Sequence, residues 1–210
     1  MNDGDTPPVP PLVRAIGTRR SLRAFAPDPV PSETLAVSFE AARWAPSSGN
    51  GQPWRFVVTR RGTPAFEAVA ATLRSGNAWA REAPVLMLVA AKTVHDSPGK
   101  PVRENRRALL DLGLALENLL LQASQDGLIA HPMAGFDADA AAAATGVDGP
   151  YTVAVLLALG YPGDPETLDP KVRARDARPR TRLPQSAFVF EDRWGAPASW
   201  TGEGQEGNGS

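Results

Sequence analysis

A short basic run near the N-terminus carries residue types that can hold a phosphate. Arg19, Arg20 and Arg23 flank Ser21 within five positions of the chain. Guanidinium groups bind phosphate oxygens through charge-assisted, often bidentate hydrogen bonds, and the serine hydroxyl adds another donor. Taken alone, the run is explained better as a solvated basic turn, so its function depends on what other segments accompany it.

Two polar segments further along the chain could contact a planar ligand. Residues 45–54, APSSGNGQPW, offer hydroxyl and amide groups in a loop that contains Pro and Gly, which suits the donor and acceptor edge of a heterocycle. Residues 131–137, HPMAGFD, span the end of an expected strand and the start of a helix, where unpaired backbone N–H groups can face a ligand. Alone, the first segment could be only a polar turn. In the second, Asp137 is expected to cap a helix and His131 to be a structural residue.

A second basic cluster lies late in the chain, at Arg178, Arg180 and Arg182, and read alone it is a surface charge run. The familiar catalytic sequences are absent: there is no G-x-S-x-G, Walker A or H-E-x-x-H sequence, and no G-x-G-x-x-G follows a strand. The chain also has no cysteine and two histidines, which excludes disulfides, iron–sulfur clusters and thiolate metal sites. If the protein is an enzyme, a cofactor is therefore expected to carry the chemistry.

The composition is that of a folded protein with no strong charge. The 210 residues have a net charge of −1, with 42% hydrophobic and 21% charged residues. These values exclude a fully disordered chain and give no electrostatic reason to expect nucleic acid or an anionic membrane as a partner. The acidic, Pro-rich start is unlike a targeting peptide, and the longest apolar stretch, 108–123, is interrupted by charge and too short to span a bilayer. A cytoplasmic location is expected.

Hydrophobic periodicity predicts alternating helices and strands that would position these segments. Helices are expected at 32–45, 63–73, 106–125 and 137–146. Ser32 is expected to cap the first, and Thr63, which is followed by proline, to start the second. Strands are expected at 54–59, 84–92, 128–133, 151–159 and, isolated, 188–191. The continuous apolar strands and the leucine-rich third helix, expected to be mostly buried, indicate an α/β or α+β fold with a sheet covered on both faces.

The domain organisation follows from the same pattern. We expect a flexible arm at 1–11, one domain at 12–194 and a flexible tail at 195–210. Within the domain, the Pro- and Arg-rich stretch that begins at residue 165 is too long for an ordinary connection. Residues 165–194 are therefore expected to form an extended arm that wraps around a neighbouring subunit in a dimer.

Taken together and in order, these segments resemble the FMN-dependent nitroreductase family from about Leu12 to Trp194. The matching stretches are TRRSLRAF (18–25), APSSGNGQPWRFVV (45–58), DLGLALENLLLQA (111–123), HPMAGFD (131–137), ALGYPGD (158–164) and RPRTRLPQSAFVFEDRW (178–194). The resemblance implies an α+β, three-layer sandwich with a central mixed sheet flanked by helices. It also implies a homodimer that exchanges C-terminal arms and binds FMN at the subunit interface.

The resemblance further assigns the cofactor-binding residues. The FMN phosphate and part of the ring edge would be held by Arg19, Arg20, Ser21 and Arg23. Arg180 and Arg182 would approach the same phosphate from the C-terminal side. The other subunit would supply Pro46, Ser47, Ser48 and Asn50, with Gln52 close by. Met133, Ala134 and Gly135 would present backbone to the isoalloxazine, and Asn77 an amide. No protein side chain is expected to be catalytic, because flavin N5 carries the chemistry, and no metal is expected.

The implied function is a ping-pong FMN-dependent oxidoreductase. It would take a hydride from NADH or NADPH and reduce a nitroaromatic, quinone, enone or flavin. Two alternatives stay open: an FMN-dependent oxidase or desaturase, and a non-catalytic flavin-binding dimer. Ala134 stands where some relatives carry glutamate. Arg106 and Arg107 could face an acidic substrate, the NADPH phosphate or solvent.

Overall fold

A computed structural model of the protein describes residues 12–96, 98–99 and 101–201. By their internal contacts these residues belong to two units, 12–177 and 178–201, which are treated separately below. The expected N-terminal arm and residues 202–210 of the expected tail lie outside the described residues. Within the described part, no helix is long and apolar enough to cross a membrane.

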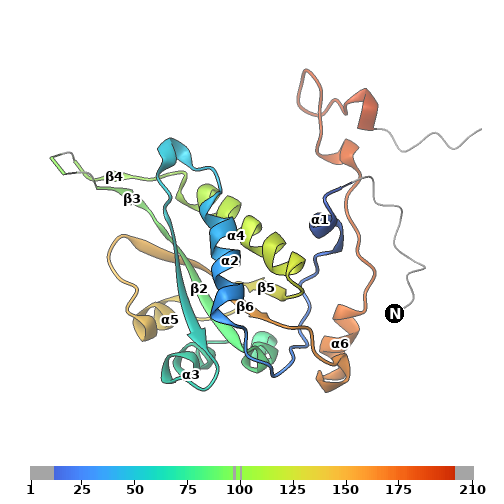
Figure 1. The fold of residues 1–210 in the computed structure, drawn as a ribbon. Helices are drawn as coiled ribbons and strands as arrows, with labels where there is room; N and C mark the ends of the chain where they lie inside the picture. Colours follow the sequence, from blue (N-terminus) through green and yellow to red (C-terminus); the bar gives the residue numbers. More distant parts are fainter. Residues whose placement is uncertain (1–11, 97, 100, 202–210) are drawn as a thin grey trace, which may run out of the picture. The chain divides into compact units, whose positions relative to one another are not determined.

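The first unit is organised around a four-stranded sheet (Figure 1). Its strands, in spatial order, are β1 (Trp54–Arg60), β2 (Val85–Lys92), β6 (Tyr151–Gly160) and β5 (Ile129–Met133). The two central strands are continuous apolar runs because both faces of the sheet are covered. All four strands were expected at these places from the sequence.

The α+β class is confirmed, but the expectation of a mixed sheet is wrong for the described chain. Every neighbouring pair of strands in the sheet is antiparallel. The connection from β1 to β2 leaves and re-enters the sheet at the same end, since Arg60 pairs with Val85. The same holds from β2 to β6, where Lys92 pairs with Tyr151. Such connections give antiparallel neighbours however many helices they contain.

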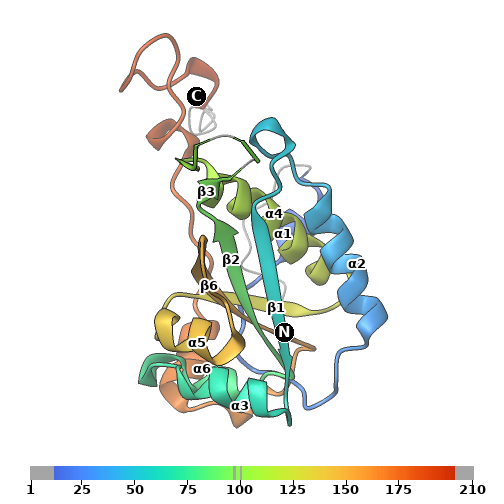
Figure 2. The same ribbon diagram turned by 90° about the vertical axis from the view of Figure 1, so that its left-hand side faces the viewer.

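Helices cover the sheet on both faces and make three layers (Figures 1 and 2). On one face, α2 (Ser32–Arg43) and α4 (Ala108–Gln125) pack on alternate residues of β2 such as Met87. On the other face, α3 (Pro64–Ala71) and α5 (Ala138–Thr145) share a second core cluster with the intervening residues, such as Leu88. This division follows the two-residue period of a strand. The 3-10 segment η3 (Ser75–Glu82) belongs to the second cluster.

Two of the three residues expected at helix starts make the capping hydrogen bond. Thr63 accepts a hydrogen bond from Phe66 N at 3.2 Å and Asp137 accepts one from Ala140 N at 3.0 Å, so both residues are N-caps as expected. Ser32 is instead the first residue of α2 and makes no capping bond. Its hydroxyl instead accepts a hydrogen bond from the Arg60 guanidinium of β1 at 3.0 Å, and it accepts none from the helix backbone.

Helix α4 is less buried than its composition predicts. One face, including Leu112 and Leu119, is buried in the first core cluster. The opposite face leaves Leu109, Leu110 and Leu114 exposed by 58%, 64% and 41%. The expectation that this helix is mostly buried therefore fails within one chain, because nothing in the first unit covers that face.

Smaller elements complete the first unit. They are α1 (Arg14–Thr18), η2 (Ser48–Asn50), β3 (Val94–His95), β4 (Arg103–Glu104), η4 (Pro165–Thr167) and α6 (Pro170–Asp176). Strands β3 and β4 form a separate short hairpin ahead of α4.

The second unit has little regular structure of its own. It contains the single turns η5 (Gln185–Ala187) and η6 (Ser199–Thr201). The expected strand 188–191 is reduced to one bridge between Phe190 and Pro197. Phe188 and Trp194 are 60% and 91% exposed, so this segment presents large apolar side chains that its own unit does not cover.

Candidate functional site

The basic run 19–23 is held in place by side chains from distant elements. Arg19 donates to Ser21 Oγ at 3.1 Å, and its Nε lies 4.0 Å from a carboxylate oxygen of Glu117 on α4. Arg23 donates to Asp176 at the end of α6 twice, from its backbone N to Oδ2 at 2.8 Å and from its guanidinium to Oδ1. Arg20 donates to the Asp176 carbonyl at 2.9 Å. One residue of α6 thus binds two of the three arginines.

Sequence reasoning missed Asp176. Its side chain is only 10% exposed, and it pairs with a residue 153 positions earlier. No local pattern distinguishes it from the other acidic residues of the C-terminal region, because its partner is determined by the tertiary fold alone. Its pairing with Arg23 joins the run to α6, whereas Arg19 and Ser21 bind each other and Arg19 lies beside Glu117 of α4.

His131 connects the run to the end of β5. Its Nδ1 lies 3.2 Å from the Leu22 carbonyl, which can only accept, so this nitrogen carries the proton in that contact. Burial lowers the pKa of His131, and the hydrogen bond to Leu22 acts in the opposite direction. The ring packs on Trp79 at 4.5 Å between centroids, and the Arg23 guanidinium lies 5.6 Å from the Trp79 ring. The expected structural role for His131 agrees with this packing.

Asn77 meets the Gly135 turn beyond β5. The Asn77 amide donates to the Gly135 carbonyl at 3.1 Å, and Arg74 N donates to the same oxygen at 3.1 Å. A Cβ on residue 135 would lie 2.5 Å from Asn77 Nδ2, so this approach requires glycine. Beside it, Met133 is buried and Ala134 is exposed.

The structure therefore brings three predicted segments together: 19–23, Asn77 and 131–135. They come from a loop, a 3-10 segment and a strand end that are far apart in sequence. Within the same cluster, Trp79 Nε1 is buried with no hydrogen-bond partner among the described residues. Cations, an amide and a glycine turn that lie together offer groups that can bind a phosphorylated heterocycle.

The loop 46–52 does not join this cluster within one chain. It leads into β1, whereas 131–135 ends β5, and these strands form opposite edges of the sheet. With neighbouring strands about 4.8 Å apart, the two edges are separated by about 14 Å. The loop makes hydrogen bonds within itself, accepts one at the Gln52 carbonyl from Arg55 of β1 at 3.1 Å, and donates one from Ser48 N to Asp111 of α4 at 3.2 Å. Pro46, Ser48, Asn50 and Gln52 are exposed, and Ser47 is half-buried.

The remaining basic residues divide between the units. Arg182 in the second unit is exposed and donates to the Thr181 carbonyl at 2.8 Å, and Arg180 is half-buried. Their approach to a phosphate stays a prediction. In the first unit, Arg106 pairs with Glu104 at 3.0 Å, and both side chains are exposed. Arg107 is also exposed, directly before α4.

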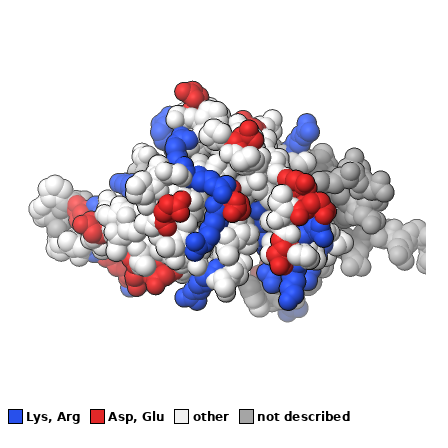
Figure 3. Space-filling model, turned by 90° about the horizontal axis from the view of Figure 1, so that it is seen from below, with Lys and Arg blue, Asp and Glu red and all other residues white. Residues whose placement is uncertain are grey.

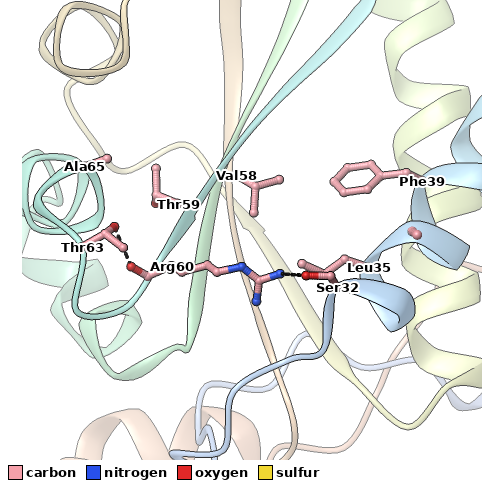
Figure 4. A pocket seen from close by; sticks show the side chains of 9 residues that line it. Ser32, Leu35, Phe39, Val58, Thr59, Arg60, Thr63 and Ala65 are labelled. Carbon is pink, nitrogen blue, oxygen red and sulfur yellow. Dashed lines mark hydrogen bonds between the residues drawn. The ribbon is translucent and has the colours of Figure 1, made fainter.

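A separate hollow of about 550 Å³ lies beside the sheet and contains none of the predicted site residues (Figure 4). Leu35 and Phe39 of α2 and Val58 of β1 form its apolar walls. At one end, Arg60 donates to the Val30 carbonyl at 2.6 Å and to Ser32 at 3.0 Å. This hollow is thus distinct from the arginine cluster.

The charged side chains of the face in Figure 3 and the metal-ligand types among the described residues form no further site. On the face shown in Figure 3, basic and acidic side chains are interspersed and form no field of one sign. Among the residues that the structure describes, no three His, Asp or Glu side chains gather as a metal site would require.

Known proteins resemble this chain in sequence and in fold. Residues 16–161 match the model of the nitroreductase family. An NADH dehydrogenase of Thermus thermophilus is 32% identical over 200 residues, 82% of this chain and 91% of the relative. A crystal structure of an oxidoreductase containing FMN superimposes with a TM-score of 0.86 at 29% identity, covering 93% of this chain and 99% of that one. A protein of Desulfovibrio desulfuricans solved in complex with FMN gives 0.67 at 26% identity, with coverage of 89% and 99%.

Proposed function

Since this chain belongs to the nitroreductase family, we propose that it is an FMN-dependent oxidoreductase. It takes a hydride from NADH or NADPH and passes it to an oxidised acceptor. The acceptor is a nitroaromatic, a quinone, an enone or a flavin, and the two substrates use one pocket in turn. The observation that carries the proposal is the meeting of 19–23, Asn77 and 131–135 at one end of the sheet.

The basic run is the proposed phosphate site. Arg19 is aligned by Ser21 and by Glu117, so its guanidinium is held near one orientation before a ligand arrives. Arg23 is bound to Asp176 and lies over Trp79, which restrains its guanidinium on the side of the cluster that faces α6. Arg20, Arg180 and Arg182 complete the set of cations in the proposal.

The Gly135 turn is the proposed contact with the ring. Both carbonyls of the turn are engaged by the chain, Gly135 O by Asn77 and Ala134 O by Phe136 N. The turn is therefore suited to present N–H groups rather than carbonyls to a ligand. The absence of a Cβ at residue 135 lets Asn77 stay beside this turn. FMN, when bound, supplies the hydride chemistry, and the chain orients it and excludes water.

Two subunits are proposed to build each site. The loop 46–52 and the strand end 131–135 lie on opposite edges of the sheet, so a second copy supplies the loop. The exposed leucines of α4 form an apolar face of the kind that buries in homodimers. In the second copy, Pro46, Ser47, Ser48, Asn50 and Gln52 face the flavin bound by the first.

The C-terminal segment of the second copy is the proposed occupant of the hollow beside β1. Strand β1 is an edge strand, and its free edge can pair with an extended segment. The apolar walls of the hollow match the exposed Phe188 and Trp194 in chemistry.

Analytical ultracentrifugation tests the dimer and should show two copies of the chain in one particle. Leu110→Glu, which places a charge on the exposed face of α4, should shift it toward monomer.

A visible spectrum of the purified protein tests the function. We expect a yellow protein that bleaches anaerobically when NADH or NADPH is added, and that recovers its colour when a quinone follows. A yellow protein that neither nucleotide bleaches would exclude the hydride-donor assignment and favour an oxidase or a binding role. A colourless protein that FMN does not reconstitute would overturn the proposal.

A further inference from the structure

The loop 46–52 adopts an unfavourable backbone conformation. Gly49, Asn50 and Gln52 have φ angles of 58°, 54° and 43°. Only three described residues other than glycine have positive φ, and two of them are in this loop. Such residues cost free energy and persist only where surrounding contacts determine the conformation.

The contacts within the loop are exposed to water. Gln52 N donates to Ser47 Oγ at 3.0 Å, and the Gln52 side chain donates to Asn50 Oδ1 at 3.2 Å. Asn50 N donates to the Ser47 carbonyl at 3.0 Å. Water competes for each of these groups, so their net contribution is small. They define the shape of the loop but are weak restraints on it.

Asp111 supplies the buried restraint. It lies in the first turn of α4 and is 4% exposed, and its carboxylate accepts the hydrogen bond from Ser48 N at 3.2 Å. Hydrogen bonds to a carboxylate are among the stronger ones in proteins, and water has little access to the buried Asp111 side of this bond, although Ser48 is exposed. This bond ties the middle of the strained loop to the helix whose exposed leucines face the proposed second subunit.

We propose that Asp111 is a positioning residue for the flavin site. It holds Ser48 so that the loop presents Ser47, Asn50 and Gln52 in one geometry, and it does not touch the ligand itself. The inference rests on the proposed function, since it assigns the loop to FMN. Its structural half, the control of the loop by Asp111, does not depend on the ligand.

A different role for Asp111 makes a different prediction. An acidic residue in the first turn also stabilises a helix through its charge. Asp111→Asn removes that charge but keeps an acceptor for Ser48 N, whereas Asp111→Ala removes both. The asparagine variant therefore separates loop positioning from a simple charge effect. Asp139→Ala is the matched control, because Asp139 is an exposed acidic residue in the first turn of α5.

Two measurements test the proposal. Hydrogen exchange of the Ser48 amide in FMN-free protein should be slow in the wild type, Asp111→Asn and Asp139→Ala, and at least about tenfold faster in Asp111→Ala. Fluorescence titration should show FMN affinity about tenfold weaker in Asp111→Ala and within about threefold of wild type in the other two variants. If Asp111→Ala does not fold, the asparagine variant decides by the same two criteria.

Three outcomes would overturn the inference. These are unchanged Ser48 exchange in Asp111→Ala, an asparagine variant as defective as the alanine variant, and altered exchange without any change in FMN affinity. A wild-type protein that binds no FMN overturns the proposed function together with the flavin half of the inference. In that case, the exchange measurement still supports or refutes the control of the loop by Asp111.

Discussion

The two polar segments of the candidate site are held in opposite ways. The basic run 19–23 and the residues that follow it are fixed by partners from across the fold: Asp176 binds Arg23, His131 binds the Leu22 carbonyl, and Phe25 forms a bridge with Pro162. The loop 46–52 is shaped mostly by its own residues and has one buried tether, at Asp111. A segment with many distant partners resists deformation, whereas a strained loop with one tether depends on that tether.

The largest expected effect comes from the place where the run crosses the end of β6. A Cβ on residue 163 would lie 2.4 Å from the backbone of Phe25, which cannot move independently. Gly163→Ala should therefore lower the free energy of unfolding by about 3 kcal/mol. Gly76→Ala, at an exposed glycine with no atom within 4 Å of the added group, is the control and should change it by less than about 1 kcal/mol. Urea unfolding measures both, and equal midpoints would contradict the comparison.

The second effect concerns Asp176 of α6, which binds Arg23 of the basic run. Asp176→Ala leaves the half-buried Arg23 without its acceptor and should destabilise the protein by about 2 kcal/mol. Asp176→Asn keeps an acceptor for Arg23 N and should recover part of that loss. Thermal unfolding provides the measurement. A wild-type melting temperature in Asp176→Ala would mean that the run does not depend on α6.

A third prediction uses acid to probe the His131 contact. Burial lowers the folded-state pKa of His131, so the unfolded chain takes up its proton first as pH falls. The stability that neutral His131 provides is complete above the unfolded pKa of about 6.5 and is lost progressively below it. Unfolding free energy should therefore drop between about pH 7 and 5.5. His131→Asn should flatten this drop, and His95→Asn, at an exposed histidine, should retain it.

The smallest effect is expected in the strained loop. Gln52→Gly relieves a positive φ of 43° and removes only the exposed hydrogen bonds from the Gln52 side chain to Asn50. The free energy of unfolding should rise by up to about 1 kcal/mol while FMN affinity falls, because the loop gains alternative conformations. Gln52→Ala loses the same side-chain hydrogen bonds but keeps the positive φ, so its free energy of unfolding should not rise. A stabilised alanine variant would show that backbone strain is not the cause.

The sequence predicted well the features that repeat locally. All four strands of the sheet, the Thr63 and Asp137 caps and the α4 boundaries depend on short patterns. The motif resemblance correctly identified the family. It also assigned Arg23, Asn77 and Gly135 to one site; these residues lie in one cluster, and their contact with FMN stays a prediction. Asp176 and Asp111 were missed as structural partners, because tertiary contacts alone pair them with the run and the loop. The strand direction and the exposed face of α4 also depend on tertiary arrangement.

The position of Asp176 also determines how short a working version of this protein can be. The last strand of the sheet ends at Gly160, so a fragment that ends there keeps every strand and still lacks the carboxylate that binds Arg23. A protease that cleaves after Arg175, one residue earlier, would separate Asp176 from the sheet. The smallest fragment that preserves the sheet is therefore shorter than the smallest fragment that preserves the arginine cluster.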